Sequence, residues 1–122
     1  MMDIKWRDKP DKHNYPAAVS YLSLIFSDKA AGRIVKELHR TKVVGFKAKD
    51  IFRASGLSLL GVSNSHVVEN NRKIEAGEKL SPILLVRDSK IGKVIIADGY
   101  HRLCAVYHFN EDAVIPCQIV KK

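Results

Sequence analysis

The chain has 122 residues, 46% of them hydrophobic, and a formal net charge of +8 at pH 7. This size and apolar content are typical of one compact domain with a real core, so we expect a single domain over residues 1–122. The apolar runs are too short to cross a bilayer, and two cysteines are too few for a disulfide scaffold. These features favour a cytoplasmic protein with reduced thiols and no membrane partner, and the positive charge favours polyanionic ligands.

The N-terminal third predicts two helices after a polar segment, residues 1–13, that we expect to be frayed. Asn14 can cap the first helix, whose apolar positions recur every three or four residues as far as Phe26. Ser27 is the expected cap of the second helix, which is apolar on one face. Its outward face carries Arg33, Lys36 and Arg40. We therefore treat residues 14–42 as a helical extension.

Residues 43–122 predict a small mixed β-sheet with flanking helices, which makes the fold class α+β. Alternation and β-branched residues indicate the strands, and apolar positions at helical spacing indicate the helices between them. The expected strands are 42–46, 81–88, 93–98 and 114–120. The expected helices are 63–77, capped by Ser63 or Ser65, and 99–109, with a short helix or loop at 47–54.

One turn, in the stretch IIADGYHRL, predicts a phosphate site. An apolar strand breaks at Gly99, which can adopt a left-handed conformation and lets a ligand approach the backbone. The helix that follows begins with amides that have no partner within the helix, at the positive end of its dipole. His101 and Arg102 project from this first turn and supply donors suited to phosphate oxygens.

Two neighbours of that turn have more than one possible role. Asp98 would repel a phosphate, so it could instead cap the helix, hold a sugar hydroxyl or coordinate a divalent cation. Capping is the reading we prefer. Tyr100 could stack on a base or sugar, or cover the edge of the sheet.

The order of these elements resembles the ParB/sulfiredoxin-like superfamily. The resemblance lies in a Pro-Ile strand, a hairpin, a second strand ending in a Gly-x-x-Arg turn, a helix, and a strand beginning near IPCQIV. Upstream, VGFKAKDI and VVENNRKIEAG stand where that family has its first strand and the helix before the Pro-Ile strand. The resemblance covers about Val43 to Val120, its most specific part is DGYHR, and residues 14–40 lie outside it.

The resemblance implies that the phosphates of a nucleotide, ATP, ADP or CTP, rest on Gly99, His101 and Arg102. Sulfiredoxins have a catalytic cysteine where this chain has Tyr100, so sulfinic acid reduction is not expected. Partition proteins bind CTP at a Gly-Glu-Arg-Arg type turn and carry a further helical DNA-binding domain, for which we see no room here.

The DGYHR turn is more similar to the Asp-Gly-His-His-Arg turn of the family's small-molecule serine kinases. In those enzymes the aspartate and an upstream glutamate assist phosphoryl transfer. The resemblance therefore makes Asp98 and Glu69 the catalytic candidates of a phosphotransferase, acting with or without Mg²⁺. The alternative for Glu69 is an exposed carboxylate on a helix, which is the reading we favour.

A basic stretch supports a different function. Residues 28–53 contain eight basic and three acidic side chains, which fits nucleic acid, a phosphorylated ligand or a solvated surface. The alternative function is thus a non-enzymatic DNA-binding or partition module, and a nuclease ranks lower because no acidic metal cluster is visible. No metal site is predicted. The candidate nucleic-acid contacts are Arg33, Lys36, Arg40, Lys47, Lys49 and Arg53.

Overall fold

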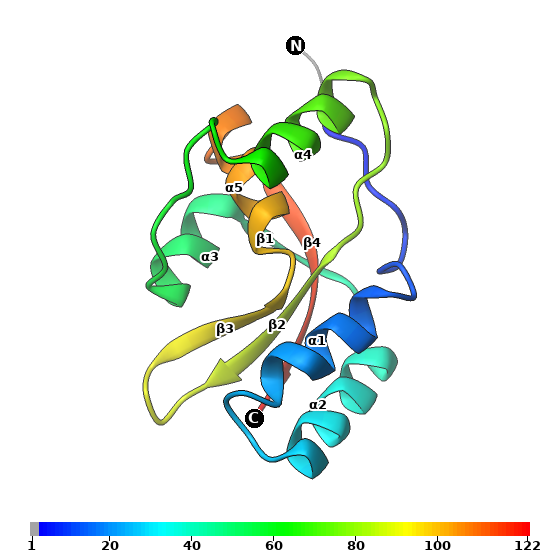
Figure 1. The fold of residues 1–122 in the computed structure, drawn as a ribbon, viewed down its shortest axis with the longest axis vertical. Helices are drawn as coiled ribbons and strands as arrows, with labels where there is room; N and C mark the ends of the chain where they lie inside the picture. The colour runs from blue at the N-terminus through cyan, green and yellow to red at the C-terminus, as the bar shows by residue number, and fades with distance from the viewer. Residues whose placement is uncertain (1–2) are drawn as a thin grey trace.

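The computed structural model describes residues 3–122 and has the predicted α+β class, with helices packed around a four-stranded mixed sheet (Figure 1). No helix in this part of the chain is long and apolar enough to cross a bilayer. The elements are α1 (Asn14–Leu22), α2 (Asp28–Arg40), β1 (Val44–Lys47), α3 (Ala48–Ser55), α4 (Ser65–Glu75), β2 (Ile83–Asp88), β3 (Lys93–Asp98), α5 (Tyr100–Phe109) and β4 (Val114–Lys121).

The sheet has the strand order β1-β4-β2-β3. β1 pairs antiparallel with β4, β4 pairs parallel with β2, and β2 pairs antiparallel with β3. The apolar run of β2 is buried on both faces over Ile83 to Val86, which is why it lacks the alternation of a half-exposed strand. β2 therefore lies at the centre of the molecule, and its two ends define two different surfaces.

Helices cover both faces of the sheet. Leu84 and Val86 point toward α1 and α2, whereas Ile83 and Leu85 point toward α3, α4 and α5, because successive side chains of a strand alternate between faces. The result is a helix–sheet–helix arrangement, visible in Figure 1 with α1 and α2 on one side. Residues 14–42, predicted as an extension, thus supply seven of the ten buried residues in the core cluster on that face of the sheet.

The N-terminal segment is ordered over the described residues, contrary to the prediction for residues 1–13; Met1 and Met2 lie outside the description. Trp6 forms a parallel bridge to Leu80. The amide of Arg7 donates to the Leu80 carbonyl and the amide of Leu80 donates to the Lys5 carbonyl, both at 2.8 Å. These bonds hold the N-terminal segment beside the residues that lead into β2. The pairing is too short to produce the alternation of apolar residues by which a strand is predicted.

The helix starts were predicted in part. Ser27 caps α2, since its hydroxyl accepts from the Ala30 amide at 3.1 Å. Asn14 does not cap α1. It is the first helical residue, the N-cap is His13 without a side-chain bond, and α1 ends at Leu22, four residues before the predicted end. The Asn14 side chain is instead turned toward the β3–α5 turn.

Candidate functional site

The β3–α5 turn has a left-handed glycine at its centre. β3 ends at Asp98, Gly99 has φ 111°, and α5 begins at Tyr100. A Cβ on Gly99 would lie 2.8 Å from Ile83 Cγ1 and 2.9 Å from Arg102 Nη2. The missing side chain therefore makes room for other parts of the protein, whereas we had expected it to admit a ligand.

The first turn of α5 has no cap. No side chain bonds to it, and within residues 3–122 the amides of Tyr100, His101 and Arg102 donate to no acceptor. Such amides carry the positive end of the helix dipole, so this turn can receive an anion. The uncapped helix start is therefore present as predicted, and the binding of an anion to it stays a prediction.

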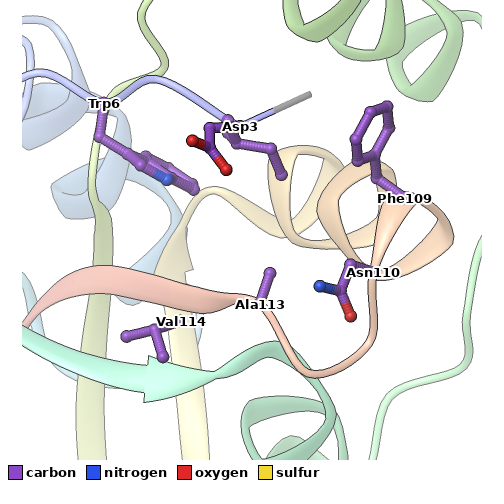
Figure 2. Close-up of a pocket in the computed structure, with 7 residues that line it drawn as sticks. Asp3, Trp6, Phe109, Asn110, Ala113 and Val114 are labelled. Carbon is purple, nitrogen blue, oxygen red and sulfur yellow. The ribbon is translucent and has the colours of Figure 1, made fainter. Parts of the chain in front are cut away.

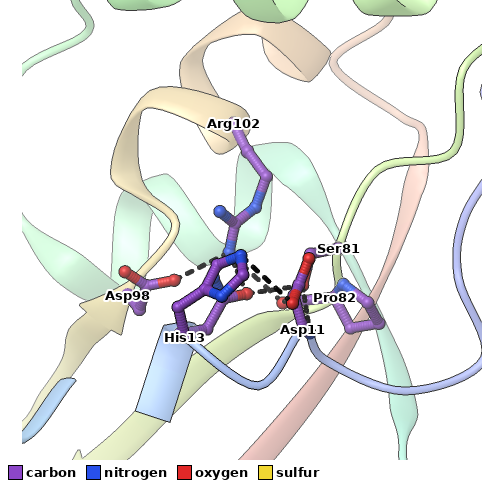
Figure 3. A network of polar contacts seen from close by, with 7 residues as sticks. Asp11, His13, Ser81, Pro82, Asp98 and Arg102 are labelled. Atoms are coloured by element: carbon purple, nitrogen blue, oxygen red, sulfur yellow. Dashed lines mark hydrogen bonds and ion pairs between the residues drawn. The ribbon is translucent and has the colours of Figure 1, made fainter. Parts of the chain in front are cut away.

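Asp98 and Arg102 form an ion pair, where we had predicted that Asp98 caps α5. Arg102 Nη2 donates to Asp98 Oδ2 at 3.0 Å, to the Pro82 carbonyl at 3.3 Å and to Asn14 Oδ1 at 3.4 Å (Figure 3). The side chains of Asp98 and Arg102 are only 19% and 16% exposed. Arg102 follows Asp98 by four positions, and its side chain turns back toward the strand end, where the guanidinium reaches the carboxylate.

The rest of the Arg102 guanidinium is not used by the protein. Nε is buried without a hydrogen-bond partner, and Nη1 makes no hydrogen bond within the described residues. One nitrogen therefore fastens the turn to α1 and to Pro82, just before β2, while the other two hold unused donor capacity. Ser81 extends the same network, because its hydroxyl donates to Asn14 Oδ1 at 2.5 Å and accepts from the Asp11 amide at 2.9 Å.

Two histidines meet beside the uncapped turn. The rings of His66, in the first turn of α4, and His101 lie with centroids 4.6 Å apart and planes tilted by 44°. Burial lowers the pKa of His101, and the nearby His66 lowers it further. The sequence leaves open whether His66 lines the pocket, because nothing in it places the start of α4 against α5.

The first turn of α4 differs from that of α5 in being capped. Asn64 Oδ1 accepts from the amides of His66 at 3.0 Å and Val67 at 3.3 Å. The cap is therefore Asn64, between the predicted candidates Ser63 and Ser65. Of the two helix starts that meet here, only α5 has its first amides free for a ligand.

Tyr100 ties the α3–α4 loop to α5. Its hydroxyl donates to the carbonyl of Ser58, and its ring packs against the core between the sheet and α3 to α5. Burial raises the pKa of Tyr100, and Cys104 adds to this effect. The Tyr100 ring also lies 5.6 Å from the ring of His101, so the loop and the histidine pair form one continuous surface.

Glu69 lies one helical turn after His66, with an exposed side chain engaged by a cation. Arg72 Nη2 donates to Glu69 Oε1 at 2.9 Å, and Arg72 Nη1 donates to Glu78 Oε2 at 3.0 Å. The hydrogen bonds from Arg72 lower the pKa of Glu69. The structure thus places the second catalytic candidate on the same helix as His66 but in an ion pair.

The predicted nucleic-acid contacts do not form one surface. One group projects from α2, which covers one face of the sheet, and the other belongs to β1 and to α3 on the opposite face. In the second group, the Nζ atoms of Lys47 and Lys49 lie 4.0 and 2.7 Å from Oδ1 of Asp112, with which they form ion pairs. The two groups are Arg33, Lys36 and Arg40, and Lys47, Lys49 and Arg53.

A sizeable pocket lies away from the turn. It has a volume of about 760 Å³ and is lined by the N-terminal segment and the end of α5, with Trp6 and Phe109 on its walls and Asp3 as its only charged group (Figure 2). A carboxylate without a cation does not suit phosphate. Within residues 3–122 no group of three or more His, Cys, Asp and Glu residues could hold a metal ion.

Comparison with protein-family models, with curated proteins and with solved structures found no match to this chain. The resemblance to the ParB/sulfiredoxin-like superfamily therefore stays a hypothesis based on the order of the elements and on the DGYHR turn.

Proposed function

We propose that this chain binds a nucleotide, ATP, ADP or CTP, through its phosphates at the start of α5. The uncapped first turn carries the proposal, because the amides of Tyr100, His101 and Arg102 have no acceptor within the described residues. His101 and His66 stand beside these amides and add imidazole donors. Amides at a helix start together with cationic donors are a common way of holding phosphate.

Arg102 has a double role in this proposal. In the free protein its Nη2 is held by Asp98, and Nη1 is left for a phosphate oxygen. A doubly charged phosphate is a stronger competitor for a guanidinium than one carboxylate, so binding would loosen the Asp98 pair. The carboxylate would then be released next to the bound phosphate.

The base of the nucleotide has an apolar surface within reach. The α3–α4 loop is fixed to α5 through Tyr100 and runs directly into the first turn of α4. Its side chains Leu57, Leu59 and Val62 are 43%, 41% and 59% exposed. Apolar side chains beside a phosphate site suit the flat, weakly polar face of a base.

Phosphoryl transfer to a small hydroxyl is the activity that would use the two carboxylates. Asp98 stands at the turn, and Glu69 lies one helical turn from His66. Both are ion-paired in the free protein, so either could orient a hydroxyl only after its cation has turned to the phosphate. The described residues offer no built metal cluster, so Mg²⁺ would have to arrive bound to the nucleotide.

Calorimetric titration with ATP, ADP and CTP tests the binding proposal. His101→Asn should weaken the binding of the preferred nucleotide about tenfold or more, since one charge-assisted hydrogen bond contributes roughly 1.5–3 kcal/mol. The matched control is His39→Asn, in α2 on the other face of the sheet, where the ring is stacked on Tyr15. This variant should bind within twofold of the wild type.

The proposal fails if the wild type takes up none of the three nucleotides, or if both histidine variants lose affinity equally. Transfer is tested separately, by following nucleoside diphosphate release in the presence of Mg²⁺ and small hydroxyl compounds. Asp98→Asn should keep nucleotide binding and lose turnover. Turnover equal to that of the wild type would remove Asp98 from the reaction.

A further inference from the structure

A positively charged surface lies at the opposite end of β2 from Gly99. It is built from the outward side of α2, the β2–β3 turn and the end of β4, which meet there in space although they are far apart in the sequence (Figure 1). We call it the basic surface. Its cations are Lys29, Arg33, Lys36, Arg87, Lys90, Lys121 and Lys122.

The basic surface consists of two adjoining hollows. One, of about 580 Å³, is lined by the strand ends and the turn, and the other, of about 610 Å³, lies along α2. Arg33 lines both and so joins them. Arg87 is paired with Lys121 in the parallel register, and the Lys122 amide donates to the Arg87 carbonyl at 3.0 Å, which fixes the backbone of the first hollow.

The charges of the basic surface are largely unneutralised. Only two carboxylates line the hollows, Asp28 and Asp88, against seven cations, a local excess of five. Asp88 is 6% exposed and is held by Lys122 at 3.6 Å. Within residues 3–122 none of the other six cations is in an ion pair. Clustered, unpaired cations repel one another, and a polyanion relieves that repulsion.

We propose that the basic surface binds the phosphate backbone of double-stranded nucleic acid. Rises of 1.5 Å per residue place Lys29, Arg33 and Lys36 about 6 and 4.5 Å apart along α2, a spacing that can follow the closely spaced phosphates of a duplex. The hollows also suit a rounded duplex better than a flat lipid surface.

The absence of stacking groups favours a duplex over a single strand. No aromatic side chain other than the His39 imidazole lines either hollow, and His39 is stacked on Tyr15 with ring centroids 3.5 Å apart. The ring of Phe26 lies beneath Lys122, whose Nζ is 5.2 Å from its centroid. Proteins that hold single strands usually stack bases on open aromatic rings, which this surface does not present.

This inference differs from the nucleic-acid surface predicted from the sequence, with which it shares only Arg33 and Lys36. The stretch predicted from the sequence is divided by the sheet, whereas the basic surface is assembled from three segments that meet at one end of it. It also goes beyond nucleotide binding at α5. Either activity can be present without the other.

Fluorescence anisotropy of the full chain with a labelled 20-base-pair duplex tests the inference at 50, 100 and 200 mM NaCl. Engagement of about five phosphates predicts a slope near −4.5 for the logarithm of the association constant against the logarithm of salt. The variant Arg33→Ala/Arg87→Ala/Lys90→Ala should reduce the slope by about three and weaken binding roughly 30-fold or more at 100 mM. The three side chains are exposed, so the fold should be unaffected.

The matched control is Lys47→Ala/Lys49→Ala/Arg53→Ala, which removes the same charge from β1 and α3. It should change the affinity less than threefold. Equal losses in the two triple variants, or no duplex binding by the wild type, overturn the inference. Vesicles rich in phosphatidylserine form a further arm, because Leu24 and Ile91, 85% and 61% exposed, lie in the adjoining turns. Binding to vesicles without binding to duplex also overturns it.

Discussion

The imidazole rings of His66 and His101 lie 4.6 Å apart and join the first turns of α4 and α5. Burial lowers the pKa of His101, and a positive charge on the nearby His66 lowers it further, so protonation of both rings together is disfavoured. An anion received by the α5 amides would reverse this preference, because it stabilises the imidazolium forms. If an anion binds as proposed, the pair would link the charge of the site to its occupancy.

Anion affinity should consequently rise as the pH falls. The pKa of His101 lies below its usual 6.5, so the ring is neutral at pH 8 and becomes a cation only in acid. Sulfate is a suitable probe, since it stays doubly charged throughout this range. We expect its affinity to increase about fivefold or more between pH 8 and 5.5, measured by displacement of the nucleotide, and to change little in His101→Gln. A flat profile in the wild type would exclude the histidine pair from the site.

Folding stability should have the opposite dependence on pH. A base whose pKa is lowered in the folded state binds fewer protons than in the unfolded chain, so its contribution is present above pH 6.5 and is lost as the pH falls through the folded value. His66→Ala removes one cause of the lowering and should raise the pKa of His101. NMR titration of the ring proton measures this directly, and an unchanged pKa would show that His66 does not act on it.

Gly99→Ala should be strongly destabilising, because the residue has φ 111° and a Cβ would lie 2.8 Å from Ile83. Left-handed strain and overpacking together predict a loss of about 3 kcal/mol in the free energy of unfolding, measured by urea denaturation. Gly32→Ala is the matched control. It lies within α2 with no atom within 4 Å of the added carbon, so a gain of about 0.5–1 kcal/mol is expected.

Asp98→Ala and Asp98→Asn distinguish an ion pair from a helix cap. Loss of the charge-assisted bond to the partly buried Arg102 should cost about 2 kcal/mol in the alanine variant. The asparagine variant keeps an oxygen acceptor for Nη2 and should cost about 1 kcal/mol. Equal losses in the two variants, measured by urea denaturation, would mean that the charge on Asp98 has no part in holding Arg102.

Local patterns predicted the elements well, because helical and strand spacing and the cap at Ser27 are properties of neighbouring residues. The β3–α5 turn was predicted for the same reason, since a strand, a glycine and the start of a helix are recognised within a few neighbouring positions. What the sequence did not reveal are the partners at long range. Asn14 was predicted to cap a helix, yet its side-chain oxygen accepts hydrogen bonds from Ser81 and Arg102, which are 67 and 88 residues away in the sequence.

The same limit explains the errors at the candidate site. Asp98 reads as a cap because it precedes a helix, but the actual contact depends on how the Arg102 side chain folds back over the strand end. His66 carries no motif, and its place beside His101 follows from the packing of α4 on α5. Likewise the basic surface draws on β2, β4 and α2, a combination that charge counted along the chain does not reveal.

The placement of α1 and α2 over one face of the sheet has a practical consequence for anyone who trims this chain. A fragment beginning at residue 43 would expose the apolar side chains of one whole face of the sheet, among them Leu84, Val86, Ala97 and Val120. It would also lose the Asn14 oxygen that accepts a hydrogen bond from the Arg102 guanidinium. Such a fragment should precipitate, and a failed ligand assay on it would say nothing about the intact molecule.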